Sequence, residues 1–404
     1  MNENCKDLQY YKFSAYGFLK NLRFFEPFFI LFLLSRDFSY IQIGTLYAIR
    51  EVAINIIEIP TGIFADVWGR KKTMLASFIS YIIAFIILYR SQSYIILAVA
   101  MIFYAFGDAC RTGTHKAMIF DYINSKGCGD RKSWYYGNTR AWSQRGSALS
   151  ALFAGILVFW QGDYSSIFLY SIIPYVLDFI LILSYPAYLD KSGDKNPGTK
   201  AVLKASLNAL KNRFVLKKVV SVSLFSGYYK AVKDYLQPVL QSAALAMPLF
   251  IDKTEEQRSA VTIGLVYTVI YFLTSQASSR AGKIHNRFKN AAAILFYTLM
   301  IGVGAGVAGG ILYYFNMPWL AAAAFLLIFL LQNIRKPIGI GFLGDSIEPQ
   351  ILATVLSVES QSQTLWTAFF AIIIGTAAQL INLPAALVIC SAGLFIVGLF
   401  TRQN

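Results

Sequence analysis

The chain has 404 residues, of which 56% are hydrophobic and only 14% are charged, and its net charge at pH 7 is +15. Soluble domains average about 25% charged residues, so this composition excludes an ordinary soluble protein and predicts a membrane protein. The basic residues recur in short connections between apolar runs and do not form one patch. This distribution argues against nucleic acid as a partner and follows the positive-inside rule.

Twelve segments are apolar enough and long enough to cross the membrane as helices, which takes about 20 residues each. They run near 12–34, 40–64, 73–90, 94–121, 135–160, 164–189, 216–245, 259–281, 290–314, 318–346, 352–378 and 383–400. The sequence therefore predicts an all-α polytopic membrane protein with twelve transmembrane helices.

The connections after the second, fourth, sixth and eighth spans hold most of the loop bases, so we place them and both termini in the cytoplasm. The longest connection, 190–215, carries an apolar helical face with lysines opposite. This pattern predicts an amphipathic helix on the inner leaflet, although a solvated linker explains the first half equally well. The connection divides the chain into an N-terminal six-helix half, 1–189, and a C-terminal six-helix half, 216–404.

The two predicted halves share sequence patterns in one consistent order. YGFLKNLR at 16–23 matches SGYYKAVK at 226–233, IGTLYA at 43–48 matches IGLVYT at 263–268, and Arg111 with Asp121 matches Arg335 with Asp345. The offsets rise from 210 to 220 to 224 along the chain, as small loop insertions after a duplication would produce. An internally repeated chain of this kind, with a binding site near mid-membrane, is typical of secondary transporters.

The stretch GIFADVWGRKK, residues 62–72, joins the second and third predicted spans. It resembles the signature loop of the major facilitator superfamily, and EIP at 58–60 resembles bacterial members. The resemblance implies a two-half transporter fold and a cytoplasmic gate. In that gate Gly62 lets a neighbouring helix approach, Asp66 meets the start of the eleventh span, and Arg70, after Gly69, pairs with Asp121. A plain basic loop would explain Arg70 and the lysines, but it would not explain Asp66 or the glycines.

Many charges lie inside the predicted spans, where each costs about 2.5–3.5 kcal/mol on insertion scales. Near mid-membrane, nine bases face six acids, so the sequence predicts a substrate that is an organic anion or a zwitterion. Structural ion pairs that neutralise one another are the alternative explanation. The residues predicted to bind substrate are Lys20, Arg23, Arg50, Arg111, Arg145, Lys230, Lys233 and Arg335.

Carboxylates in the same region are candidate proton carriers, because burial and neighbouring bases act on a carboxyl in opposite directions. We predict Glu26, Glu51 and Asp108 as proton-coupling residues. Lys20 with Arg23, and Lys230 with Lys233, are three residues apart. In a helix each pair would share a face, so the first and seventh spans would each present a cationic pair.

The function predicted from these features is secondary active transport by alternating access, coupled to protons, of a small organic anion or zwitterion. Proton-driven efflux of drugs or other amphiphiles is one alternative, and a membrane receptor on a transporter scaffold is another. An enzyme is not expected, because His115 and His285 have no metal or acid–base spacing and the chain has no phosphate-binding loop. We expect no metal and no cofactor, an ion gradient as driving force, and a monomer in the bilayer of the bacterial inner or plasma membrane.

Overall fold

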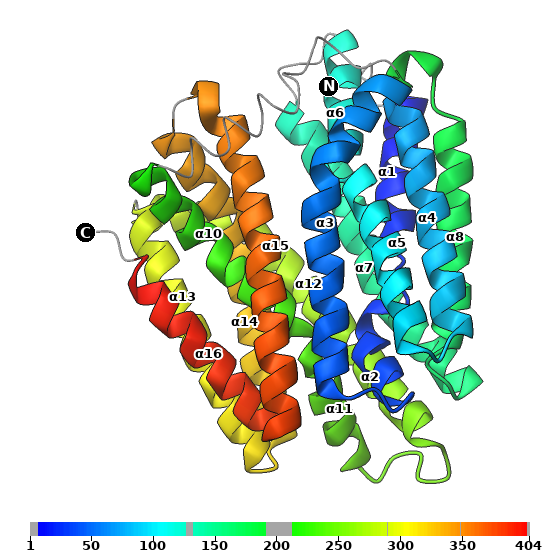
Figure 1. The fold of residues 1–404 in the computed structure, drawn as a ribbon, viewed down its shortest axis with the longest axis vertical. Helices are drawn as coiled ribbons and strands as arrows, with labels where there is room; N and C mark the ends of the chain where they lie inside the picture. The colour runs from blue at the N-terminus through cyan, green and yellow to red at the C-terminus, as the bar shows by residue number, and fades with distance from the viewer. Residues whose placement is uncertain (1–6, 127–131, 191–211, 289, 348, 402–404) are drawn as a thin grey trace. The chain divides into compact units, whose positions relative to one another are not determined.

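A computed structural model describes residues 7–126, 132–190, 212–288, 290–347 and 349–401 (Figure 1). These residues form helices joined by turns and short irregular segments, with no strand among them. The all-α prediction is therefore confirmed for the described part of the chain. The predicted amphipathic helix lies almost wholly outside the described residues.

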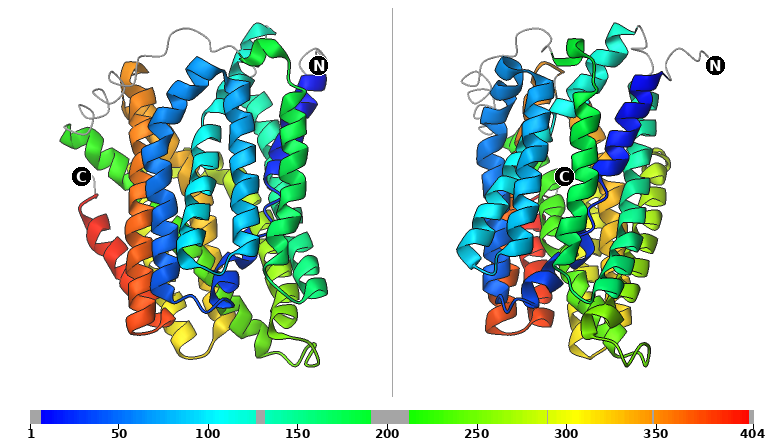
Figure 2. Two further views of the ribbon diagram at one scale, coloured as in Figure 1. Left: turned by 45° about the vertical axis from the view of Figure 1, so that its right-hand side comes forward. Right: turned by 90° about the vertical axis from the view of Figure 1, so that its right-hand side faces the viewer.

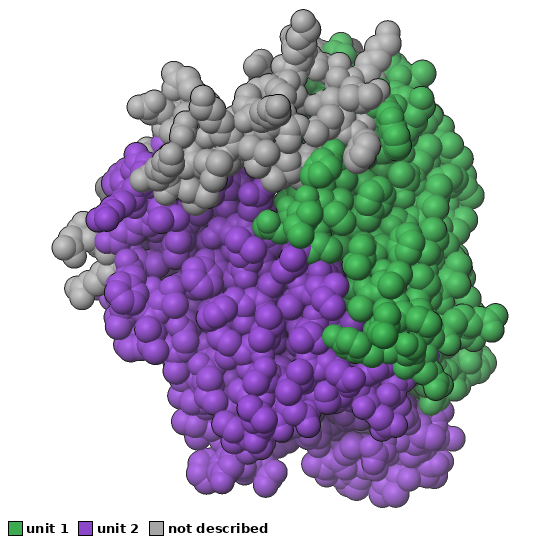
Figure 3. All heavy atoms as spheres, viewed as in Figure 1, with its two compact units in different colours: residues 1–28, 53–199, 264–271 green, residues 29–52, 200–263, 272–404 purple. Residues whose placement is uncertain are grey.

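The chain folds into two compact units, which Figure 3 distinguishes by colour. Unit 1 comprises Met1–Phe28, Ala53–Thr199 and Gly264–Tyr271, and unit 2 comprises Phe29–Val52, Lys200–Ile263 and Phe272–Asn404. Helix α3 (Tyr40–Trp68) starts in unit 2 and ends in unit 1. Helix α12 (Glu255–Phe288) has a middle section in unit 1 and both ends in unit 2.

In unit 1, α4 packs against α5 and α8, and α1 packs against α7. Polar side chains begin two of these helices: Asp7 accepts a hydrogen bond from the N–H of Tyr10, and Asp163 accepts from the N–H groups of Ser165 and Ser166. Such caps satisfy amides that have no partner inside the helix. Besides its part of α3, unit 1 contains α1 (Leu8–Lys20), η2 (Glu26–Phe28), α4 (Arg70–Arg90), α5 (Tyr94–Arg111), α6 (Thr114–Ser125), α7 (Lys132–Gln161), α8 (Ser166–Leu183) and η4 (Ala187–Asp190).

In unit 2, α10 packs against α15, and α13 packs against α14 and α16. Figure 2 shows α15, in orange, beside α16, in red. Asparagine side chains cap α10, α13 and α16 through Asn212, Asn290 and Asn382. Unit 2 contains α2 (Phe29–Leu34), α10 (Arg213–Val232), η5 (Lys233–Tyr235), α11 (Leu236–Leu245), α13 (Ala291–Tyr314), α14 (Pro318–Ser346), α15 (Pro349–Leu380) and α16 (Leu383–Leu399).

The first and seventh predicted spans are both interrupted, so the prediction of continuous helices over 12–34 and 216–245 is wrong. Helix α1 ends at Lys20, and α10 gives way to the 3₁₀ turn η5 at Lys233. Pro27 and Pro238 follow the two breaks. A proline has no N–H to donate to the carbonyl four residues earlier, so it weakens the helix before it and is tolerated in the first turn of a new one, where Pro238 lies in α11. The side-chain amide of Asn21 also donates to the carbonyl of Gly17 (2.6 Å) at the end of α1.

Two glycine contacts explain why each unit takes a segment from elsewhere in the chain. In unit 2, a Cβ on Gly44 of α3 would lie 3.1 Å from Cα of Gly375 on α15. In unit 1, a Cβ on Gly264 of α12 would lie 3.0 Å from Cα of Gly155 on α7. Small residues let helix backbones approach this closely. Gly264 lies 220 residues after Gly44, and Gly375 lies 220 residues after Gly155, which is the offset of the repeat that the sequence shows around IGTLYA.

The stretch 62–72 is mostly helix, which corrects its description as a loop. Helix α3 continues to Trp68, and α4 begins at Arg70. The connection between them is the single residue Gly69, whose φ of 101° lies in a region that favours glycine. Because the chain reverses at one residue, Arg70 and Lys71 belong to the first turn of α4.

Seven of the described helical segments are long and apolar enough to cross a membrane: Arg70–Arg90, Tyr94–Ile123, Ser166–Leu183, Glu255–Ala281, Ala291–Tyr314, Pro318–Gly344 and Thr354–Leu380. Leu383–Leu399 is a shorter apolar helix. The other predicted spans correspond to interrupted helices, such as α1 with α2 and α10 with α11, or to helices rich in polar residues, such as α3 and α7. Those interruptions and polar residues mark the candidate functional site.

Candidate functional site

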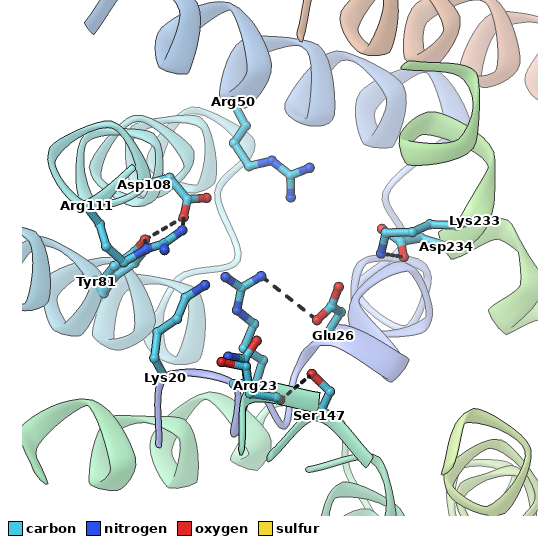
Figure 4. Close-up of polar contacts among 12 residues, drawn as sticks. Lys20, Arg23, Glu26, Arg50, Tyr81, Asp108, Arg111, Ser147, Lys233 and Asp234 are labelled. Atoms are coloured by element: carbon cyan, nitrogen blue, oxygen red, sulfur yellow. Dashed lines mark hydrogen bonds and ion pairs between the residues drawn. The ribbon is translucent and has the colours of Figure 1, made fainter. Parts of the chain in front are cut away.

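In unit 1, charged side chains gather where α1 breaks off and where α5 ends (Figure 4). Lys20 is the last residue of α1, and Arg23 lies in the break, 4.0 Å from the carboxylate of Glu26. The spacing of the two bases predicted that they share one helix face. This prediction is wrong, because the helix ends between them. Lys20 is 9% exposed, and no hydrogen bond or ion pair of its ammonium group is found among the described residues.

Arg111 and Asp108 form the best-connected ion pair of unit 1. Arg111 Nη2 donates to Asp108 Oδ1 over 3.0 Å, and the Tyr81 hydroxyl on α4 donates to the same oxygen over 2.5 Å. Arg111 Nε also donates to the Tyr81 hydroxyl over 3.2 Å, which closes a three-membered network. Charge-assisted hydrogen bonds of this kind are stronger than neutral ones. The network fixes both charges in place, as Figure 4 shows.

In unit 2, Glu51 is the centre of a second charged cluster. It is 2% exposed, and its Oε1 accepts from Arg50 Nη2 over 2.9 Å. Its second oxygen, Oε2, accepts no hydrogen bond and lies 3.7 Å from Nζ of Lys230. Glu51 therefore binds one base closely and a second base only through a longer ion pair.

A second acid of the same cluster, Asp234, is fully engaged. Lys233 Nζ donates to Asp234 Oδ1 over 2.5 Å, and the Tyr47 hydroxyl donates to Oδ2 over 3.0 Å. The guanidinium of Arg50 also lies over the Tyr47 ring, 4.8 Å from its centroid. Tyr47 and Asp234 thus join the start of α3 to the break between α10 and α11.

Two of the bases predicted to bind substrate lie apart from these clusters. Arg145 is exposed and lies over the ring of Trp142 at 4.9 Å. Arg335 is 3% exposed, and its guanidinium donates to the carbonyls of Leu295 and Ser221 and to Thr298 Oγ1. Because backbone carbonyls occupy its donors, Arg335 connects α14 to α13 and α10 and is not positioned as a free anion binder.

Some of the predicted gate residues are brought together at the start of α4. Arg70 forms an ion pair with Asp121 on α6. The surroundings of Gly62 and the side chain of Asp66 lie outside the described part of the structure, so the predicted roles of both residues stay predictions. Gly69 approaches Asp190 so closely that a Cβ there would lie 2.4 Å from its carboxylate.

Asp190 and Asp178 are functional candidates that the prediction of site residues missed. Asp190 Oδ1 accepts from the N–H of Lys71 over 2.8 Å and so caps α4 from a distant part of the chain. Asp178, on α8, is fully buried with no hydrogen bond to either oxygen. The sequence does signal Asp178, since it is a lone acid in an apolar span. Nothing near Asp190 in the sequence indicates its contact with α4.

The sequence matches the family model of the Major Facilitator Superfamily over residues 17–371. An uncharacterised MFS-type transporter of Bacillus subtilis, YxaM, is 27% identical over 247 residues, which cover 57% of this chain and 58% of YxaM. The chain thus spans less than two thirds of that relative.

Solved structures agree in fold, at sequence identities too low to compare function. The nucleoside transporter NupG superposes with a TM-score of 0.77 at 12% identity, covering 99% of this chain and 98% of NupG. The peptide transporter POT gives 0.75 at 12% identity, covering 98% and 93% of the two chains. A bacterial homologue of the lysosomal transporter Spinster, inward-facing and unoccupied, gives 0.72 at 12% identity, covering 98% and 97%. The family match and the shared fold together show that the chain is an integral membrane protein and belongs to the Major Facilitator Superfamily of transporters.

Proposed function

We propose that the protein is a proton-coupled secondary transporter that moves a small organic anion or zwitterion. Proton coupling and alternating access are typical of its family. The observation that carries the proposal is that, in each of the two charged clusters, the described bases outnumber the acids that pair with them. The surplus base of unit 1, Lys20, is buried, and a buried cation is costly unless something negative binds it, as a substrate carboxylate would.

In unit 1, the cluster has three bases, Lys20, Arg23 and Arg111, and two ion-paired acids, Glu26 and Asp108. A third acid, Asp178, forms no ion pair with a described base and is not counted. Lys20 is the surplus base, because Arg23 and Arg111 each have a carboxylate within 4.0 Å. A lysine ammonium carries three donors on a flexible stem, so it can turn toward an incoming anion.

In unit 2, the paired bases and acids are Arg50 and Lys230 with Glu51, and Lys233 with Asp234. Glu359 and Lys336 add one further acid and one further base nearby, since Glu359 interacts electrostatically with both Lys336 and Lys230. The cluster therefore has four bases against three acids. Lys230 is its most loosely held base, at 3.7 Å from an acid that Arg50 already binds.

Among the three predicted proton-coupling acids, the geometry favours Glu51. Its Oε2 accepts no hydrogen bond, so it can take up a proton without breaking one. Asp108 accepts two donors on Oδ1 and is better suited to hold Arg111 in place. Glu26 lies 4.0 Å from Arg23, a weaker pair, and remains a second candidate.

We propose that the chain forms two six-helix halves, 1–189 and 216–404, in the inner or plasma membrane, with the basic connections and both termini in the cytoplasm. Its support is the alternation of charge between connections and the repeated glycine contacts. Labelling of single cysteines introduced at Lys126 and Asp252, from either side of sealed vesicles, tests this orientation. Labelling of both from the same side would contradict it.

A ligand screen on the purified full-length protein tests the proposed substrate class. A compound that binds the folded state raises the melting temperature, so carboxylates, amino acids, dipeptides, nucleosides and lipophilic cations are compared at equal concentration. We expect carboxylates or zwitterions to stabilise the protein and to enter vesicles in a way that a protonophore abolishes. Stabilisation by lipophilic cations alone would favour amphiphile efflux instead, and transport that ignores the protonophore would exclude proton coupling.

A further inference from the structure

Asp178 lies in the face of α8 that packs against the end of α1. Its exposed fraction is 0%, and neither carboxyl oxygen has a hydrogen-bond partner among the described residues. No ion pair links it to a described base either. Tyr175, one turn earlier on α8, donates its hydroxyl to the carbonyl of Lys20 over 3.4 Å. Asp178 is therefore held beside the segment that carries the surplus base of unit 1.

The titratable groups that interact electrostatically with Asp178 come from α1, α5 and the segment after α8. They are the two bases Lys20 and Arg111 and the phenols Tyr16 and Tyr185. Two groups on other elements packed against α8 are engaged elsewhere: Tyr81 of α4 donates to Asp108, and Arg145 of α7 is exposed.

Of the two bases, only Lys20 is available to Asp178. Arg111 is tied to Asp108 and to Tyr81, as described above. The two phenols are buried hydroxyls that carry no charge at neutral pH. A buried carboxylate with no donor and no ion-paired base costs several kcal/mol, whereas the neutral acid costs only as much as an unbonded polar group. The arrangement, in which no described base forms an ion pair with Asp178, therefore suits the protonated acid, and ionisation requires Lys20 to move into ion-pair contact.

We propose that Asp178, in unit 1, carries a coupling proton in addition to the one assigned to Glu51 in unit 2, and that it competes with the anionic group of the substrate for Lys20. This inference rests on the proposed function. When an anion binds Lys20, Asp178 takes up a proton from water and stays neutral. When the anion leaves, the Asp178 O–H bond breaks, the proton returns to water, and the carboxylate pairs with Lys20. Each negative charge that enters the site is thus accompanied by one proton, and the net charge of the site stays constant.

Infrared difference spectroscopy of the purified full-length protein, titrated from alkaline to acidic pH, tests this without any substrate. A protonated carboxyl in an apolar site gives a C=O stretching band that an ionised carboxylate lacks. We expect this band in wild type and in Asp252→Asn, whose carboxylate is exposed in a loop. We expect Asp178→Asn to lack it. In Lys20→Met the band should persist to higher pH, because the counter-charge that stabilises the carboxylate is gone.

Identical spectra for wild type and Asp178→Asn would overturn the proposal, and so would a titration that Lys20→Met leaves unchanged. If Asp178→Asn does not fold, Asp178→Glu is measured in its place. A C=O stretching band at a frequency different from that of wild type supports the proposal, and a band at the wild-type frequency overturns it. The proposed transport function fails by a different result. Wild-type transport that ignores a protonophore would exclude proton coupling while leaving the infrared band in place.

Discussion

Gly44 and Gly375 face one another where α3 crosses α15, and neither has room for a side chain. A Cβ on Gly44 would lie 2.4 Å from the carbonyl oxygen of Ala371, and a Cβ on Gly375 would lie 2.6 Å from that of Tyr40. Both obstacles are backbone atoms, which cannot rotate away. Gly264 and Gly155 make the equivalent contact in unit 1, so close helix crossing is a repeated feature of the fold.

Replacing Gly44 with alanine should therefore separate the two helices. We expect Gly44→Ala to lower the free energy of unfolding by about 1–3 kcal/mol, as overpacking does in other proteins. Gly304→Ala is the matched control, because a Cβ at that helical position meets nothing within 4 Å. Thermal unfolding of the two purified variants measures the difference. If Gly44→Ala and Gly304→Ala melt at the same temperature, the close crossing of α3 and α15 does not contribute to stability.

The helical fold was predictable because twelve long apolar runs leave few other structures possible in a membrane. The breaks after Lys20 and before Lys233 were not predicted, because hydropathy averages over about 20 residues and conceals a single turn. Pro27 and Pro238 were the local signals that could have located them. The helical nature of 62–68 was missed for a related reason, since a charged stretch between apolar runs is usually a loop.

The candidate site was predicted by residue type more than by arrangement. The rarity of charges in apolar spans was enough to select Lys20, Glu51 and Lys230. Arg50 is the chain neighbour of Glu51, but Lys230 lies about 180 residues further along the chain, and no local pattern encodes that second contact. The same limit explains Arg335, whose partners are two backbone carbonyls and one threonine hydroxyl, all distant in the chain.

Lys20→Ala and Lys230→Ala should each weaken binding of an anionic substrate while leaving expression intact. A hydrogen bond to a charged group contributes about 1.5–3 kcal/mol, so we expect the affinity to fall roughly 10- to 100-fold. Lys253→Ala, at an exposed loop position, serves as control. Binding is measured by the melting-temperature shift with a carboxylate hit from the screen. If both variants bind as wild type does, the substrate does not use these bases.

The ion pair between Arg70 and Asp121 should matter for turnover more than for stability. Asp121 is half-exposed, and exposed pairs contribute at most about 1 kcal/mol. We expect Asp121→Asn to slow transport several-fold with little change in substrate affinity or melting temperature. The charge-reversed double variant, Arg70→Asp with Asp121→Arg, should recover part of the rate. A double variant slower than both single variants would show that the attraction between the two charges is not what the gate needs.

Arg335→Met should destabilise unit 2 without altering substrate affinity, because the guanidinium bonds to Ser221, Leu295 and Thr298 and not to a free site. The variant loses three hydrogen bonds, and because a typical hydrogen bond contributes about 0.5–1.5 kcal/mol, the loss in unfolding free energy should be about 2–4 kcal/mol. Arg335→Lys should recover less than half, since a single ammonium cannot replace the guanidinium fork. Arg145→Met, at an exposed arginine, should leave the melting temperature near that of wild type. Normal stability combined with lost affinity in Arg335→Met would instead make Arg335 a substrate ligand.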